Sequence, residues 1–207
     1  MLFIWFCAAA VVSGEVLFDH AASSALLQKK PIRLNATGSA ELSFGEACQI
    51  LNRDDLLEAV QRGYAQTLPP DKEPEFTVTK LPDGTYYYMN RNQQETRIEE
   101  VGRVQDEKRV EVALYSEGVR FFGPYESFCI VRVMPDGPER VTYEIEVYAR
   151  PDSAVFRFFA KMAPVEMFFK HKTRSLTDMV LSVCDQILKL DADMAQTGGT
   201  CQFGGKG

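Results

Sequence analysis

The side chains that could carry acid–base or nucleophilic chemistry are scarce in this sequence. It contains two histidines, His20 and His171. A Ser-His-Asp or Cys-His site would depend on His171, because His20 lies in a leader that we expect to be flexible. His171 sits among lysines on an expected helix, where a histidine usually faces water. The sequence therefore gives little support to hydrolytic catalysis.

Two acidic clusters are the remaining candidates for catalysis. Glu99 and Glu100 are adjacent, and Glu144 and Glu146 are spaced so that both point to one face of a strand. Two such carboxylates can act as acid and base, although carboxylates on the solvated face of a sheet are the more frequent case. The sequence lacks the G-x-S-x-G, H-E-x-x-H, G-x-G-x-x-G and G-x-x-x-x-G-K-[ST] motifs. We therefore expect no enzymatic activity and no cofactor.

The cysteines favour neither a metal nor a particular disulfide. Cys7 lies in an apolar N-terminal run, and Cys48, Cys129, Cys184 and Cys201 remain if that run is removed. Four cysteines in an exported chain allow two disulfides in three pairings, which the sequence leaves open. No pair has the C-x-x-C spacing of a zinc site. Cys129 and Cys184 lie on apolar stripes, where a thiol behaves as a small hydrophobic group.

Composition restricts the class of partner. The chain of 207 residues is 45% hydrophobic and 25% charged, which is typical of one soluble globular domain. It carries 29 acidic and 23 basic residues, for a formal charge of −6. No run of lysines and arginines could form the basic surface that binds nucleic-acid phosphates. We expect a monomer that does not bind nucleic acid.

The N-terminus, "MLFIWFCAAAVVSGE", predicts a signal peptide over residues 1–14. Its apolar run is shorter than the roughly 20 residues that span a bilayer, and small residues place cleavage near Gly14. No Lys or Arg precedes the run, and the alternative is a buried N-terminal strand or helix. The signal predicts a secreted or periplasmic protein, with residues 15–31 as a leader, linker or short helix.

The elements that must position these residues begin with a strand from Ile32 to Leu42. Ser43 followed by Glu46 forms a capping box, which predicts a short helix to Leu51. A second helix, capped by Asn52 or Asp54, precedes the two prolines at 69–70. Its apolar side carries Leu56, Leu57, Val60 and Tyr64.

From residue 76 to residue 150 the hydrophobic period becomes two. Val141, Tyr143 and Ile145 alternate with polar residues, as in a strand with one buried face. Pro82-Asp83-Gly84 and Pro135-Asp136-Gly137 are turn sequences. The pattern predicts an antiparallel meander of strands at 76–81, 85–90, 95–105, 109–116, 126–134 and 140–149.

An amphipathic segment follows the meander. A short helix should begin at Asp152 or Ser153, run through Met162 and break at Pro164, which cannot donate a backbone hydrogen bond. A long helix should follow and lay its apolar stripe on the sheet, before a disordered Gly-rich tail over residues 191–207. The stripe consists of Leu176, Met179, Val180, Val183, Cys184, Ile187 and Leu188.

This order of elements resembles the START-like, or SRPBCC, helix-grip superfamily over residues 32–190. "ATGSAELSFGEACQIL" is similar to the family's first strand and helix, and "YEIEVYARPDSAVFRFFAKMAPVEMFFKHKTRSL" to its last strand, bend and entry to the gripping helix. The bend at Arg150–Ser153 lacks the family's glycines. The resemblance implies an α+β fold in which a curved antiparallel sheet of six or seven strands wraps around the long C-terminal helix, with two short helices after the first strand.

The resemblance also implies a cavity between sheet and helix for a lipid or other apolar molecule. Arg132 shares a strand face with Ile130 and Met134 and, if buried, would need a carboxylate or a ligand head group. Solid packing of the same residues, as in a structural or interaction module of the cell envelope, is the alternative, and a cyclase-like enzyme is a third. The expected cavity residues are Tyr86, Tyr88, Val112, Leu114, Val131, Arg132, Tyr143, Ile145, Phe168, Met179 and Val183.

Aromatic residues at two places could form a rim around the cavity. The segment "EGVRFFGPYESF" reads as a loop that contains Phe121, Phe122 and Tyr125, and the segment after the last strand contains Phe158 and Phe159. Basic side chains beside the second group would suit transient contact with an anionic membrane surface. An ordinary loop and a short buried helix are the alternatives.

Overall fold

The computed structural model describes residues 20–120, 123–153 and 182–192. The predicted signal peptide, the short helix and break at Pro164, and the tail beyond residue 192 lie outside these ranges. Within them the chain forms one antiparallel sheet and four helical segments, which confirms the α+β class.

The sheet has seven strands in the order β1-β7-β6-β5-β4-β3-β2. The meander β2 to β7 is therefore consecutive, and the first strand closes the edge beside the last. The bounds are β1 Ile32–Ala40, β2 Phe76–Lys80, β3 Tyr86–Asn90, β4 Glu95–Gln105, β5 Val110–Arg120, β6 Gly123–Pro135 and β7 Val141–Pro151.

The register decides which side chains share a face. Val112 of β5 pairs with Val131 of β6, which pairs with Ile145 of β7. These three side chains point to what we call the inner face, on the side of most helices. Because successive residues alternate, the neighbouring row of Glu111, Arg132 and Glu144 points to the opposite, outer face.

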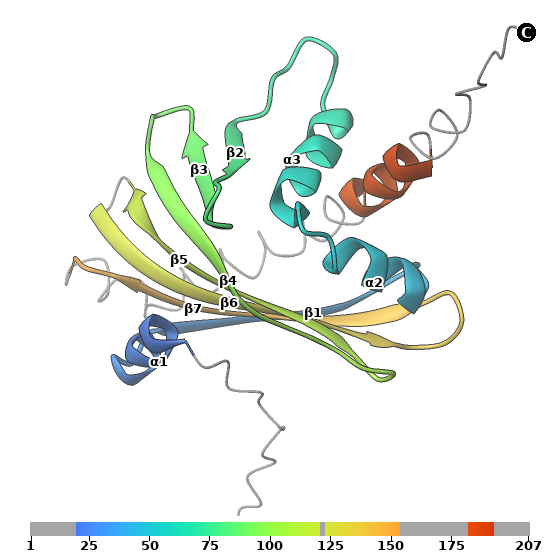
Figure 1. Ribbon diagram of the computed structural model, residues 1–207, viewed down its shortest axis with the longest axis horizontal. Coiled ribbons are helices and arrows are strands. Elements are labelled where there is room, and N and C mark those ends of the chain that lie inside the picture. Colours follow the sequence, from blue (N-terminus) through green and yellow to red (C-terminus); the bar gives the residue numbers. More distant parts are fainter. Residues whose placement is uncertain (1–19, 121–122, 154–181, 193–207) are drawn as a thin grey trace, which may run out of the picture.

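Three helical segments lie over the inner face, and the sheet curves toward them (Figure 1). They are α2 Phe44–Leu51, α3 Leu56–Thr67 and the described turns of the C-terminal helix, residues 182–192. The capping box of α2 is confirmed: Ser43 Oγ accepts from the Glu46 amide at 3.2 Å, and Glu46 Oε2 accepts from the Ser43 amide at 2.8 Å. This is the helix-grip arrangement predicted from the order of elements.

The C-terminal helix packs directly on α3 at a glycine. A Cβ atom at Gly63 would lie 2.9 Å from the carbonyl oxygen of Val183 and 3.0 Å from Ile187. Only a residue without a side chain allows the two helices to come so close. The buried side chains of Val183 and Ile187 continue into a cluster with Val112 on the sheet.

The outer face is covered at one place by α1, Ala21–Gln28. Leu26 of this helix is fully buried against Ala113 and Phe128. His20 caps the helix by accepting from the Ser23 amide at 3.2 Å. We expected residues 15–31 to form a leader, a linker or a short helix, and the structure has a packed helix over part of this range. The expectation that His20 lies in a flexible leader is therefore wrong.

Two further expectations are wrong. The segment expected as a loop, 117–128, belongs mostly to β5 and β6, which extend to residues 120 and 123. Gly118 is not a turn residue; a Cβ atom there would lie 2.4 Å from the Glu95 carbonyl oxygen on β4. The cap residue of α3 is Asp55, not Asn52 or Asp54, and its side chain makes no capping hydrogen bond because it binds arginines.

Candidate functional site

Part of the inner face is filled by side chains. Val112 on β5 is almost fully buried and packs with Val183 and Ile187. Tyr86 is also buried, and its hydroxyl donates to the Asp54 carbonyl oxygen at 2.8 Å. Tyr86, Val112 and Val183 were predicted as cavity residues, and the structure places all three within packed core.

The other predicted residues of the sheet retain accessible surface. Leu114 packs at the edge of the core cluster, whereas Val131 and Ile145 lie beside it on β6 and β7. Tyr143 lies over the neighbouring strand, where a Cβ at Gly38 would clash with its ring. All four side chains are half-buried although they face the helices. The structure thus brings them together along one stretch of the inner face.

Cys129 of β6 also lies on this stretch of the inner face. It pairs with Leu114 on β5 and Val147 on β7, in the middle of the sheet. Burial raises the pKa of its thiol to about 11, so the group lies deep in the protein. Its side chain is nevertheless half-buried rather than buried. The thiol of Cys129 thus combines a deep position in the sheet with accessible surface.

A column of planar side chains lines one end of the inner face. Tyr64 of α3 stacks on Phe76 of β2 with ring centroids 5.4 Å apart, and Phe76 stacks on Tyr88 of β3 at 5.3 Å. The guanidinium of Arg120, at the end of β5, lies over the Tyr88 ring at 4.7 Å and over the Tyr125 ring at 5.5 Å. We call these five residues the aromatic column.

Arg120 is the unusual member of the column. Its Nη1 atom is buried and has no hydrogen-bond partner. Within the described part of the chain, no carboxylate forms an ion pair with it. The two tyrosine rings compensate part of the lost hydration through cation–π attraction. They do not satisfy the N–H donors of Nη1 at the edge of the guanidinium.

Hydroxyl groups follow Arg120 along the same face. Thr96 Oγ1 and the Tyr125 hydroxyl lie 2.9 Å apart, and Ser116 Oγ lies 2.6 Å from Ser127 Oγ. In the register, these pairs stand between Arg120 and the apolar pair of Leu114 and Cys129. The inner face therefore changes from cationic through hydroxylic to apolar along β5 and β6.

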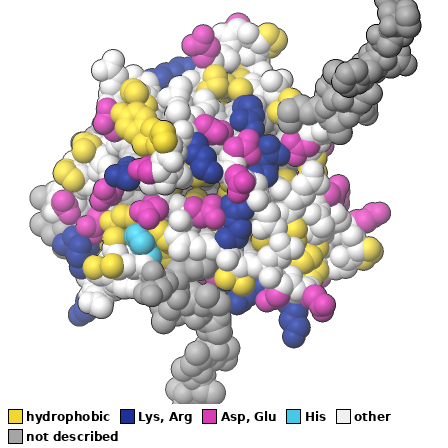
Figure 2. Space-filling model, in the orientation of Figure 1, with side chains coloured by type: hydrophobic (Ala, Val, Ile, Leu, Met, Phe, Trp, Pro, Cys, Tyr) yellow, Lys and Arg dark blue, Asp and Glu magenta, His cyan; other side chains and the backbone are white. Residues whose placement is uncertain are grey.

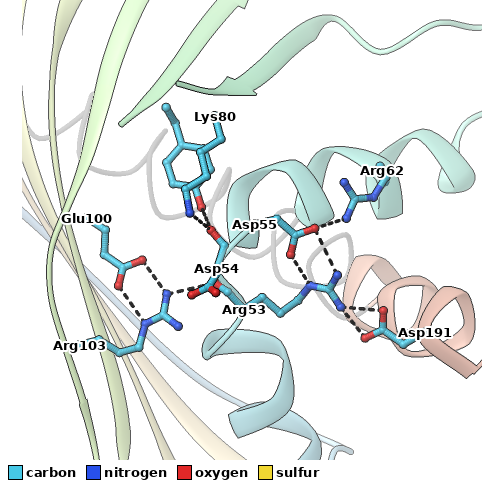
Figure 3. A network of polar contacts seen from close by, with 9 residues as sticks. Arg53, Asp54, Asp55, Arg62, Lys80, Glu100, Arg103 and Asp191 are labelled. Carbon is cyan, nitrogen blue, oxygen red and sulfur yellow. Dashed lines mark hydrogen bonds and ion pairs between the residues drawn. The ribbon is translucent and has the colours of Figure 1, made fainter. Parts of the chain in front are cut away.

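A network of polar contacts joins the covering helices to the sheet (Figure 3). Arg53 donates to Asp191 of the C-terminal helix at 2.6 Å and to Asp55 at 2.9 Å. Arg103 of β4 donates to the Arg53 carbonyl oxygen at 3.1 Å and to Glu100 at 2.6 Å. Hydrogen bonds from Arg53 and the charges of Arg53 and Arg62 hold the pKa of Asp55 at about 2. The network thus joins the C-terminal helix, the connection between α2 and α3, and strand β4.

A groove of about 580 Å³ borders the C-terminal helix where it meets the connection between β1 and α2. Leu42, Cys184 and Leu188 form its apolar part. Burial raises the pKa of the Cys184 thiol. Polar side chains, among them Glu46 and Asp185, line the rest of the groove, so it differs from the apolar stretch beside Cys129.

Arg132 does not belong to the inner face. It lies on the outer face, where Nε donates to Glu111 at 2.6 Å and Nη1 donates to Glu144 at 2.8 Å. Glu146 is 3.8 Å away. Because residues alternate along β6, Arg132 cannot face the helices when Val131 does. Its expected role as a cavity residue is therefore wrong, and carboxylates meet its need for a partner.

Glu144 and Glu146, one of the two carboxylate pairs considered for acid–base chemistry, are part of the same arrangement. We call it the outer-face ion cluster: Arg33, Arg109, Glu111, Arg132, Glu144 and Glu146. Burial alone would raise the pKa of Glu146, but hydrogen bonds from Tyr148 and Arg33 lower it overall. Glu146 is thus an anion that balances arginines and has no proton to donate near neutral pH.

Several predicted residues lie outside the described residues, and the structure says nothing of them. They are the cavity residues Phe168 and Met179 and the rim residues Phe121, Phe122, Phe158 and Phe159. Tyr125, the remaining rim residue, points to the inner face as a member of the aromatic column. Arg120 and Cys129 are among the inner-face residues that were not predicted as site residues.

The described residues carry no group of histidine, cysteine and acidic side chains arranged to hold a metal ion. Cys48, Cys129 and Cys184 are free thiols, so four cysteines do not form two disulfides. No described helix is long and apolar enough to cross a membrane. Figure 2 shows acidic and basic side chains interspersed over the face in view.

No protein-family model matches the sequence, and no curated protein matches it. Solved structures do resemble the fold. A conserved protein from Geobacillus kaustophilus superposes with a TM-score of 0.51 at 11% identity, over 76% of this chain and 96% of that chain. A START superfamily protein from Mycobacterium smegmatis gives 0.47 at 11% identity, over 75% and 98%.

Norcoclaurine synthase from Thalictrum flavum, in complex with dopamine and hydroxybenzaldehyde, gives a TM-score of 0.47 at 12% identity, over 78% of this chain and 90% of that chain. Similarity at these identities concerns the fold alone. The strand order and the covering helices make the fold of this chain START-like, as predicted.

Proposed function

We propose that this protein binds or carries a lipid or another apolar small molecule between the inner face and its covering helices, without catalysing a reaction. The observation that carries the proposal is the half-buried state of Cys129 deep in the sheet. Apolar side chains beside it, including Leu114 and Val131, also keep accessible surface. A pocket with an apolar lining and a few polar groups is the usual form of a small-molecule site.

The two alternative functions, a structural module and a cyclase-like enzyme, require different features of the inner face. A structural module would fill the face with side chains, which fits Val112 and Ile187 but not Cys129. A cyclase-like enzyme would need acid–base residues on the face that holds its substrate. The best candidates by sequence, Glu144 and Glu146, lie on the outer face and bind arginines.

Native mass spectrometry of the gently purified full chain tests the proposal. We expect a species heavier than the polypeptide, from which collisional activation releases an apolar molecule. An apolar fluorescent probe should also bind to protein stripped of that molecule, and added lipid should displace it. A bare polypeptide that binds no probe would support the filled module instead.

An exported location is part of this proposal, and it is supported by the apolar residues 1–14 alone. N-terminal sequencing of the protein from its native cells should find a chain that begins near Glu15. A chain that retains residues 1–14 would place the carrier inside the cell.

A further inference from the structure

We propose that Arg120 binds the carboxylate of an acidic amphiphile, whose apolar tail extends along β5 and β6 toward Cys129. This inference rests on the proposed function and names the chemical class of its ligand. It begins from the guanidinium of Arg120, which is stacked on tyrosines, has a buried donor atom without a partner, and has no paired carboxylate among the described residues.

The other arginines near the inner face have their charge balanced within the protein. Arg53 pairs with Asp55 and Asp191, and Arg103 pairs with Glu100. Leaving a buried donor of a charged group unsatisfied costs more than leaving a neutral one. Among the described residues, Arg120 thus differs from Arg53 and Arg103 in having no carboxylate that balances its charge.

The geometry of Arg120 suits a carboxylate. Its face is occupied by the rings of Tyr88 and Tyr125, so the donors at its edge can form two parallel hydrogen bonds to a planar carboxylate. A single unpaired cation balances a single negative charge. The Tyr125 hydroxyl, within hydrogen-bond distance of Thr96, supplies a further polar group beside the head group.

The direction of the tail follows from the strands. Starting at Arg120, the inner-face positions of β5 are Gly118, Ser116, Leu114 and Val112. At Gly118 the place of a side chain is occupied by Glu95 and Thr96 of β4, and the side chains become apolar at Leu114, which pairs with Cys129. Six residues of strand span about 20 Å. An acid with one long alkyl chain matches this amphipathic order.

Palmitate and hexadecanol form a matched pair of probes, because they share chain length and differ in the charge of the head group. Displacement of an apolar fluorescent probe from the full chain, near pH 8, measures the affinity of each. We expect wild-type protein to bind palmitate ~10- to 100-fold more tightly than hexadecanol, as for a charge-assisted hydrogen bond. Arg120→Met should remove that preference and leave hexadecanol binding unchanged.

Two variants separate the effect of Arg120 from general effects of charge. Arg97→Met removes an exposed arginine of β4 and should keep the full preference for palmitate. Arg120→Lys keeps the charge but loses the planar fork, so it should keep only part of the preference. Circular dichroism and unfolding curves confirm that each variant is folded.

The outcomes test the role of Arg120 separately from the proposed binding of an apolar molecule. Equal affinity for palmitate and hexadecanol in the wild type, or a preference that survives Arg120→Met, overturns the role of Arg120 and leaves apolar binding intact. Failure of both probes to bind overturns the proposed function as well. A preference that disappears with Arg120→Met and survives Arg97→Met supports the inference.

Discussion

Two arginines on neighbouring strands stand in opposite situations. Arg132 of β6 lies on the outer face and has Glu111 and Glu144 within hydrogen-bond distance. Arg120 of β5 lies on the inner face, stacks on Tyr88 and Tyr125, and has no ion-pair partner among the described residues. Both guanidinium groups are at least partly shielded from water, yet the described carboxylates neutralise only that of Arg132.

The difference between Arg132 and Arg120 suggests how a residue that stabilises the fold can be told from one that is available to a ligand. In the outer-face ion cluster each arginine has a carboxylate partner, although Glu111 Oε1 makes no hydrogen bond, and removal of one member of a buried pair leaves an uncompensated charge. An arginine without a carboxylate can accept one from a ligand. The outer face thus pairs its charges within the protein, whereas Arg120 on the inner face keeps a buried donor without a described partner.

Breaking the outer-face ion cluster should have the largest effect. Arg132→Met leaves Glu111, which is 0% exposed, without its main partner. We expect the free energy of unfolding to fall by about 3–5 kcal/mol in urea denaturation. The double variant Glu111→Gln with Arg132→Met should recover most of that loss. A single variant that unfolds like the wild type would contradict this reading of the cluster.

A smaller, pH-dependent effect should follow Glu146→Gln. Because the folded pKa of Glu146 is lowered, its contribution is complete above the unfolded pKa and is lost as the pH falls through the folded value. Wild type should be more stable than the variant by about 2 kcal/mol near neutral pH, and the difference should vanish in acid. Urea denaturation over a pH series measures it; a difference that persists in acid would contradict the assignment.

Arg120→Met should have the smallest effect on stability. The variant loses cation–π contacts with Tyr88 and Tyr125 but also loses a charge that is costly to shield from water. We expect the free energy of unfolding to change by no more than about 1 kcal/mol in urea denaturation. A loss as large as that of Arg132→Met would mean that Arg120, too, serves the fold, and the comparison between the two faces would fail.

Much of the fold could be predicted from local sequence. The capping box at Ser43, the alternation from residue 76 and the turn at Pro135 are signals that neighbouring residues carry, and the corresponding elements are confirmed. Gly118 misled the prediction because its reason is distant: the backbone of β4 lies where a side chain would be. A glycine in a strand and a glycine in a loop look the same in one sequence.

The site was predicted less well, for a related reason. The alternation of β6 already showed that Val131 and Arg132 cannot share a face, and placing both in one cavity ignored it. Arg120 was hidden by the expected loop; once β5 extends to residue 120, Arg120 falls in phase with Val112 and Leu114. That no described carboxylate pairs with Arg120 depends on how distant strands pair, and the hydrophobic period does not reveal that pairing.

The central claim is that room exists beside Cys129, and adding volume there tests it directly. Cys129→Phe should leave the free energy of unfolding within about 1 kcal/mol of wild type and should abolish binding of an apolar probe. The matched variant Val112→Phe, in packed core on the same face, should lose about 1–3 kcal/mol through overpacking. If Cys129→Phe destabilises the protein as much as Val112→Phe does, the inner face is filled and the carrier account is wrong.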